Sequence, residues 1–271
     1  MKNTRWLVIV VVVIAVVLSV ILLFKKGAIP LKIKAGGITS VSGLLNQAKD
    51  LENTGDLYAA KTLYQKLVNE FSNSSEVINW QKKIDELNIK LLFSTVLTPD
   101  SVMYEIKSGD TIAKIAREFK TTPDLIMKSN NLSGDKIFPG KKIKIWTTPF
   151  TILVDKSQNI LIVKSDEEII KTYTVSTGAN NSTPVGNFKV TNKLINPTWY
   201  KAGTVVAPDS PENILGSRWL GLDVPSYGIH GTTDPQSLGR QVTQGCIRMA
   251  NPDVEELYIY IPVGTEVTIV D

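Results

Sequence analysis

Hydrophobic positions form three patterns along the 271 residues: an unbroken apolar stretch, a region with helical spacing, and a region of short strands. The apolar stretch, residues 6–24, has no charged side chain and is long enough for a helix to cross a hydrocarbon core of about 30 Å. A cleaved signal peptide has a shorter apolar core, of about 7–15 residues, and small residues at its cleavage site. The sequence therefore predicts an uncleaved transmembrane anchor at residues 1–26, followed by a linker at residues 27–39.

Residues 40–93 carry apolar side chains at the spacing of amphipathic helices. Gly55 interrupts the first run, Asp56 can cap the helix that follows, and a polar run at residues 72–75 makes a second break. The sequence thus predicts three helices, and their spacing resembles one tetratricopeptide unit with a closing helix. Packing among the helices explains this pattern by itself. Binding of a protein partner at this helical segment is the alternative, since stable repeat arrays usually need about three units.

Residues 102–147 predict the order strand, helix, helix, strand. Thr122, Pro123 and Asp124 form a strong start for the second helix: a capping residue, a proline at the first helical position and an acid in the first turn. The segment closely resembles the LysM domain. The positions that carry this resemblance are Tyr104, Gly109, Asp110, Thr111, Ile115, Ala116, Leu125, Asn130, Pro139, Gly140 and Ile143.

The LysM resemblance implies binding of glycans that contain N-acetylglucosamine, including peptidoglycan. The implied glycan-binding residues are Asp110, Thr111 and Ile112, in a shallow groove that the loop before the second strand completes. Asp110 has a second interpretation, in which it only caps the first helix.

Residues 150–271 change to β-branched runs separated by polar turns. Many short strands with one helix, near residues 254–258, predict a mainly-β domain, either an antiparallel-rich sandwich or a barrel. A sheet packed by two helices is the alternative. The chain as a whole is therefore predicted to be multidomain: a transmembrane helix, an α-helical hairpin segment, a βααβ domain and a sandwich-like mainly-β domain. The expected strands are 151–155, 160–164, 169–175, 187–192 and 266–270.

This mainly-β domain contains the chain's one cysteine, Cys246, and its one histidine, His230. A thiol becomes a good nucleophile when a base removes its proton, and imidazole is the usual base near neutral pH. The alternatives are a buried Cys that acts as a small hydrophobe and a His that is only a structural hydrogen-bonding group. One Cys cannot form an intramolecular disulfide, and one Cys with one His falls short of a zinc ligand set. We therefore expect neither a metal nor a cofactor.

The domain resembles the catalytic (YkuD) domain of L,D-transpeptidases. The motifs that carry the resemblance are Thr183-Pro184-Val185-Gly186, Pro197-Thr198-Trp199, Gly228-Ile229-His230-Gly231-Thr232 and Gly245-Cys246-Ile247-Arg248-Met249. The resemblance implies that Cys246 is the nucleophile, that His230 is the general acid and base, and that the Gly231 carbonyl orients the imidazole. The implied activity forms a thioester from a tetrapeptide stem and transfers it to an amine, giving a 3→3 cross-link in cell wall biogenesis and cell shape. It also implies acylation of Cys246 by carbapenems.

Further site residues follow from the chemistry around Cys246. The backbone N–H groups of Gly245 and Cys246 are candidates to hold the oxyanion. Arg248 has two interpretations, as a bidentate partner of a substrate carboxylate or as an anchor of the Cys loop through a salt bridge. The remaining candidates for substrate contact are Thr243, Gln244 and Trp199, although Trp199 and Trp219 are also explained by core packing. Many family members have His at the position of Gln244. Glutamine can donate a hydrogen bond but cannot titrate, so the resemblance does not extend to a titratable group near the oxyanion.

The partners predicted from the sequence are peptidoglycan and, through the anchor, a membrane. The net charge is only +4, and the sequence has no run of basic residues interleaved with aromatics, so it does not predict a nucleic-acid-binding surface. The short N-terminal tail predicts a single-pass protein of the bacterial inner membrane with its catalytic domain outside the cytoplasm. Two other functions fit the residues: an L,D-carboxypeptidase of the same mechanism and a non-catalytic peptidoglycan-binding scaffold.

Overall fold

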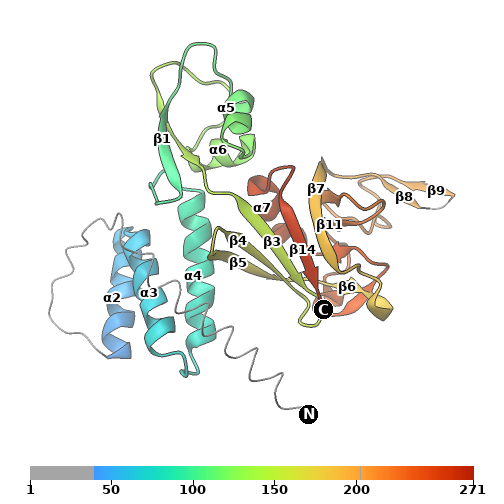
Figure 1. Ribbon diagram of the computed structural model, residues 1–271, viewed down its shortest axis with the longest axis horizontal. Helices are drawn as coiled ribbons and strands as arrows, with labels where there is room; N and C mark the ends of the chain where they lie inside the picture. The colour runs from blue at the N-terminus through green and yellow to red at the C-terminus, as the bar shows by residue number, and fades with distance from the viewer. Residues whose placement is uncertain (1–39, 202) are drawn as a thin grey trace. The chain divides into compact units, whose positions relative to one another are not determined.

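The computed structural model describes residues 40–201 and 203–271 (Figure 1). The anchor predicted at residues 1–26 and the linker predicted at residues 27–39 lie outside these described residues. Within the described ranges, no helix has both the length and the apolar character that crossing a membrane requires.

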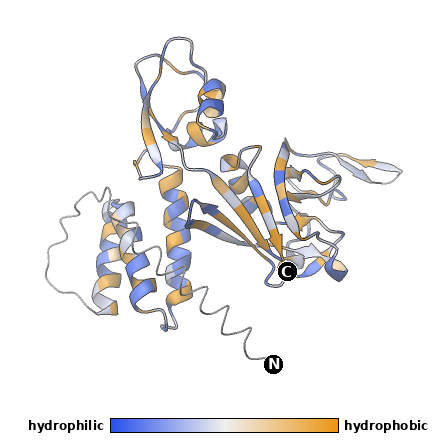
Figure 2. Cartoon of the chain, in the orientation of Figure 1, coloured by the Kyte–Doolittle hydropathy of each residue, from blue (hydrophilic) through white to orange (hydrophobic). Residues whose placement is uncertain are grey.

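The helical segment consists of α2 (Val41–Thr54), α3 (Leu57–Glu70) and α4 (Val77–Leu92), which confirms the three helices expected from the spacing. Asp56 caps α3 as predicted, because its side chain accepts a hydrogen bond from the Ala59 N–H at 3.2 Å. Hydrophobic and polar residues alternate along all three helices (Figure 2). Their buried apolar faces form one cluster that includes Leu44, Leu63, Leu67, Trp80 and Leu87.

Helix α4 also covers the edge of the large sheet at β5 (Glu168–Thr174). The Asn88 side chain donates hydrogen bonds to the carbonyl oxygens of Ile169 and Ile170 at 2.9 and 3.1 Å. The Asp85 carboxylate accepts one from the Thr172 N–H at 3.0 Å. Polar side chains of a helix thus satisfy backbone groups that a neighbouring strand would otherwise satisfy.

The second module has the predicted order β1 (Ser101–Glu105), α5 (Ile112–Glu118), α6 (Pro123–Ser129) and β2 (Lys142–Trp146), with β1 and β2 antiparallel. Thr122 caps α6 as predicted. Sequence reasoning was wrong about the cap of α5. Thr111 is the capping residue, because its hydroxyl accepts from the Lys114 N–H.

The remaining strands build an eight-stranded mixed sheet in the order β13-β11-β10-β7-β14-β3-β4-β5. The pairs β14–β3 and β11–β13 are parallel, and the other neighbours are antiparallel. Its strands are β3 (Phe150–Asp155), β4 (Ile160–Ser165), β5, β7 (Gly186–Ile195), β10 (Arg218–Leu222), β11 (Gly228–His230), β13 (Ile247–Arg248) and β14 (Glu266–Val270). Shorter pairs are formed by β6 (Thr177–Gly178) with β12 (Gln241–Thr243) and by β8 (Trp199–Lys201) with β9 (Thr204–Val206).

The mainly-β prediction is confirmed, and the sandwich-like arrangement of the layers stays a prediction. The long strand β7 makes the pairing continuous, because residues 186–189 pair with β14 and residues 190–195 pair with β10. Helix α7 (Asn251–Tyr260), the one helix expected here, packs its buried face against β10 and β11. The core between helix and sheet places β11 and β13, which carry the candidate site, on a rigid support.

Candidate active site

Strands β11 and β13 place the segments that carry the single Cys and the single His side by side. They run parallel with His230 opposite Arg248, and extending this register back by one residue places Cys246 opposite Gly228. Alternate residues of a strand share a face, so Cys246 and His230 lie on the same face of the sheet. The Cys246 thiol donates to the carbonyl oxygen of Ser226 at 3.3 Å. One parallel pairing thus places on one face of the sheet two residues that are sixteen positions apart in the chain.

The His230 imidazole is buried, at 2% exposure, and one of its nitrogens has a fixed partner. Nδ1 lies 2.7 Å from the carbonyl oxygen of Gly231. A carbonyl oxygen only accepts, so we assign the proton to Nδ1, and the lone pair then resides on Nε2. The ring also stacks on Trp219, its partner across β10 and β11, with 5.9 Å between centroids. This arrangement holds a neutral imidazole in the tautomer of a general base.

Burial keeps both reactive groups neutral. Removal from water lowers the pKa of His230 to about 4, and the nearby Arg248 charge acts in the same direction, against the carbonyls of Gly231 and Leu215. Burial likewise raises the pKa of the Cys246 thiol above its ordinary value, against the Gly228 N–H and the Arg248 charge. Near neutral pH the pair is therefore a thiol with a neutral imidazole rather than a thiolate with an imidazolium.

The hydroxyl group of Thr243 holds the turn that carries Cys246. The Thr243 hydroxyl donates to the Cys246 carbonyl oxygen at 2.7 Å and accepts from the Gly245 N–H at 3.2 Å. Among the hydrogen bonds of the described residues, none engages the Cys246 N–H. Of the two oxyanion donors predicted from the sequence, the Cys246 N–H is thus the available one, while the Gly245 N–H is used inside the turn.

Two further residues shape the His side of the site, and sequence reasoning assigned neither role. Asn251, the first residue of α7, accepts hydrogen bonds from the backbone N–H groups of Thr232 and Ser217 at 3.0 and 3.2 Å. It thereby fixes the loop that follows His230. Trp219 supplies the stacking surface for the imidazole and donates its indole N–H to another strand of the sheet. No local pattern indicates either role, because both depend on contacts between distant segments.

Arg248 contacts the loop before β12 instead of open solvent. One guanidinium nitrogen donates to the Ser237 hydroxyl at 2.8 Å and lies 3.8 Å from the Asp234 carboxylate. The buried Nε has no partner within the described part of the chain. These contacts match the anchoring interpretation of Arg248, and binding of a substrate carboxylate stays a prediction.

The structure does not test substrate contacts of the other predicted residues. Gln244 is exposed and Trp199 is half-buried on β8, so their substrate contacts, like that of Thr243, stay predictions. Asp110 and Thr111, with Ile112, line a groove of about 500 Å³ that residues 135–137 complete, as the LysM resemblance implied. The Asp110 carboxylate accepts from a backbone N–H and a tyrosine hydroxyl, each at 2.8 Å, and therefore closes a turn.

Comparisons with known proteins confirm the two resemblances. A family model described as the L,D-transpeptidase catalytic domain (YkuD) matches residues 149–269, and the LysM domain model matches residues 104–146. The relative named L,D-transpeptidase YkuD from Bacillus licheniformis is 35% identical over 176 residues, which cover 62% of this chain and 98% of that protein. The protein of the same name from Bacillus subtilis is 34% identical over 173 residues, covering 61% of this chain and 97% of that protein.

Among solved structures, an L,D-transpeptidase from Mycobacterium tuberculosis aligns with a TM-score of 0.40 and 15% identity. That alignment covers 63% of this chain and 90% of the other. The tetratricopeptide-like character of the helical segment stays a prediction.

Proposed function

Because the chain belongs to the L,D-transpeptidase family and carries its YkuD catalytic domain, we propose that it cross-links peptidoglycan stem peptides through a thioester on Cys246. The observation that carries this proposal is the fixed tautomer of the only imidazole, on the sheet face that also holds the only thiol. The LysM domain supports peptidoglycan as the polymer bound.

The first half of the reaction forms the acyl-enzyme. Nε2 of His230 accepts the thiol proton as the Cys246 sulfur attacks the carbonyl carbon that precedes the terminal D-Ala of a tetrapeptide stem. The carbonyl becomes a tetrahedral oxyanion, for which the free Cys246 N–H is the first donor. The C–N bond then breaks, the D-Ala amine leaves with the proton from His230, and a thioester remains.

The second half transfers the acyl group. The amine of a second stem attacks the thioester carbonyl and gives its proton to His230, and the C–S bond breaks as the sulfur recovers a proton. The product is a 3→3 cross-link. Because the imidazole and the thiol are both neutral at rest, each attack proceeds by general-base catalysis and does not start from a stored ion pair. We also propose that this occurs on the outer side of the inner membrane, where the polymer lies.

One assay separates this activity from its alternatives. The purified chain is incubated with tetrapeptide muropeptides, and the products are followed by mass spectrometry. Cross-linked dimers with loss of D-Ala support the proposal, whereas tripeptides alone indicate an L,D-carboxypeptidase. Unchanged muropeptides together with glycan binding indicate a non-catalytic scaffold and refute the proposal.

The nucleophile assignment has its own control. Cys246→Ala must abolish dimer and tripeptide formation, while Val242→Ala, an exposed position just before the same turn, should leave product formation unchanged. Product formation by Cys246→Ala at the wild-type rate would refute the assignment.

A further inference from the structure

Thr183, which lies outside the Cys246 turn, holds the backbone next to Cys246 through a hydrogen bond. The Thr183 hydroxyl donates to the carbonyl oxygen of Gly245 at 2.8 Å. The Thr183 hydroxyl oxygen also accepts a hydrogen bond from the Gly178 N–H at 2.7 Å, so the hydroxyl proton is committed to the Gly245 carbonyl. Thr183 is 1% exposed, which keeps water from competing for either contact.

The Gly245 carbonyl and the Cys246 N–H belong to one planar trans peptide, so they point in opposite directions. A group that fixes the carbonyl therefore also fixes the direction of the N–H. This peptide needs such a group, because Gly245 has a φ of +131°, where a residue with a side chain is strained. A Cβ at this position would also lie 2.6 Å from the Tyr227 ring, so glycine is required here. Because glycine has a wide choice of backbone conformations, its peptide needs a group that fixes it.

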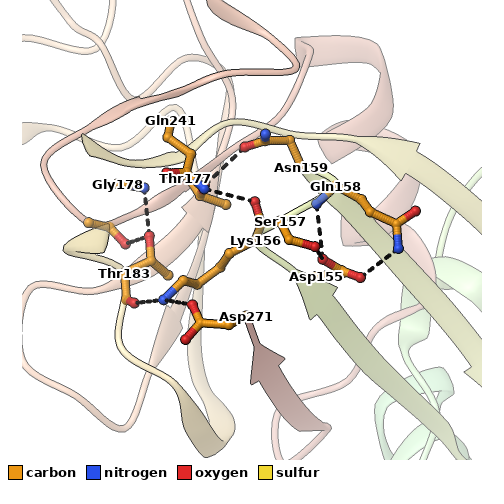
Figure 3. A network of polar contacts seen from close by, with 11 residues as sticks. Asp155, Lys156, Ser157, Gln158, Asn159, Thr177, Gly178, Thr183, Gln241 and Asp271 are labelled. Atoms are coloured by element: carbon orange, nitrogen blue, oxygen red, sulfur yellow. Dashed lines mark hydrogen bonds and ion pairs between the residues drawn. The ribbon is translucent and has the colours of Figure 1, made fainter. Parts of the chain in front are cut away.

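Thr183 is in turn held by a buried lysine (Figure 3). The Lys156 ammonium donates to the Thr183 carbonyl oxygen at 2.9 Å and lies 2.8 Å from the Asp271 carboxylate. The Lys156 carbonyl oxygen accepts from the Gln241 side chain at 3.1 Å. Lys156 is 2% exposed, and its charge is balanced by Asp271. This network joins the end of β14 and the start of β12 to the loop that presents Thr183.

We propose that Thr183 is the positioning residue of the oxyanion site: it locks the Gly245–Cys246 peptide so that the Cys246 N–H faces the developing charge, and Lys156 holds Thr183 in place. The inference rests on the proposed function, since it assumes that Cys246 attacks a carbonyl. It assigns Thr183 no contact with substrate.

Two reactions of the same sulfur test this role. Iodoacetamide alkylates the Cys246 sulfur: a C–S bond forms at a saturated carbon, the C–I bond breaks and iodide leaves, so no oxyanion is created. Meropenem is attacked at its lactam carbonyl, so that a C–S bond forms, the ring C–N bond breaks and the nitrogen takes the proton, through a tetrahedral oxyanion. Loss of one oxyanion donor typically costs about 10²–10³ in rate. Misdirecting the donor should therefore slow acylation without slowing alkylation.

The experiment measures both second-order rates by intact mass in the 271-residue chain and in Thr183→Val, which keeps the shape and removes the hydroxyl. Acylation should fall by about ten- to a hundredfold, while the alkylation rate and its pH profile stay within about twofold. Thr183→Ser, which restores the hydroxyl, should recover most of the acylation rate. Thr265→Val is the matched control, because it removes another buried hydroxyl bonded to a backbone carbonyl, and both of its rates should equal those of the unaltered chain.

Equal acylation in Thr183→Val and the unaltered chain would overturn the inference, as would a parallel fall of both rates. If Thr183→Val does not fold, Thr183→Ala carries the same comparison, since its smaller side chain leaves space for water. Failure of the unaltered chain itself to be acylated, with alkylation intact, would refute the proposed function and with it this inference.

Discussion

Acidification should protonate the buried imidazole of His230 and destabilise the fold. The perturbation is a change of pH from 7 to 4, applied to the chain and to His230→Gln, which cannot titrate. The pKa of His230 falls from its ordinary 6.5 to about 4 in the folded protein, mainly because the ring is removed from water. Each pH unit between these values corresponds to about 1.4 kcal/mol, so the free energy of unfolding should fall by about 3 kcal/mol.

The direction follows from which state binds the proton first. The unfolded chain takes it up near pH 6.5, while the folded chain resists until the pH approaches 4. The contribution of the neutral imidazole is therefore complete above pH 6.5 and is lost as the pH falls through about 4. Carboxylates titrate in both proteins, so the difference between the chain and His230→Gln isolates the imidazole.

The assay combines urea unfolding at several pH values with an NMR titration of the imidazole, which is unambiguous because the chain has one histidine. The resonance should stay in its neutral position down to about pH 5. A midpoint at or above 6.5 would refute the reasoning, because it would indicate an exposed ring or an imidazolium paired with a thiolate.

Three further predictions concern the thiol, the sheet edge and the loop after the imidazole. Alkylation of Cys246 by iodoacetamide should keep rising past pH 9.0, since burial raises its pKa; a plateau between pH 5 and 8 would indicate a preformed ion pair instead. Asn88→Ala should lower the free energy of unfolding in urea by about 1–3 kcal/mol, because it leaves edge carbonyls unpaired, whereas Asn79→Ala on the exposed face of α4 should change it little. Asn251→Ala leaves two backbone N–H groups unpaired and should slow acylation by meropenem with unchanged alkylation of the thiol; equal acylation rates would contradict its positioning role.

Local patterns predicted the elements whose signals are contained in a few adjacent residues. Asp56 and Thr122 mark helix starts because a capping side chain bonds to a backbone group three residues ahead. The same logic offered Asp110 as a cap of α5, but the hydroxyl that accepts from the helix backbone is that of the next residue, Thr111.

The reactive pair was predicted from the sequence because each residue type occurs once. Its surroundings were not, because they depend on strands of two or three residues that exist only through distant pairing, such as β11 with β13. The continuous pairing through eight strands was not predicted for a similar reason: β7 changes partners along its length, and no pattern within residues 186–195 marks the change. The supports supplied by Thr183 and Asn251 likewise arise from contacts between segments far apart in the chain.

The polar side chains of α4 bond to the backbone of β5, so the helical segment protects this edge of the sheet from pairing with another chain. An uncovered outer strand offers its free amides and carbonyls as a template for another polypeptide, and this is a common route to fibrils and exchanged dimers. A truncated chain that begins after residue 93 would retain Cys246 and His230 but lose the helix that covers β5. Recombining this catalytic domain with other targeting modules would therefore require bringing α4 along or supplying a substitute.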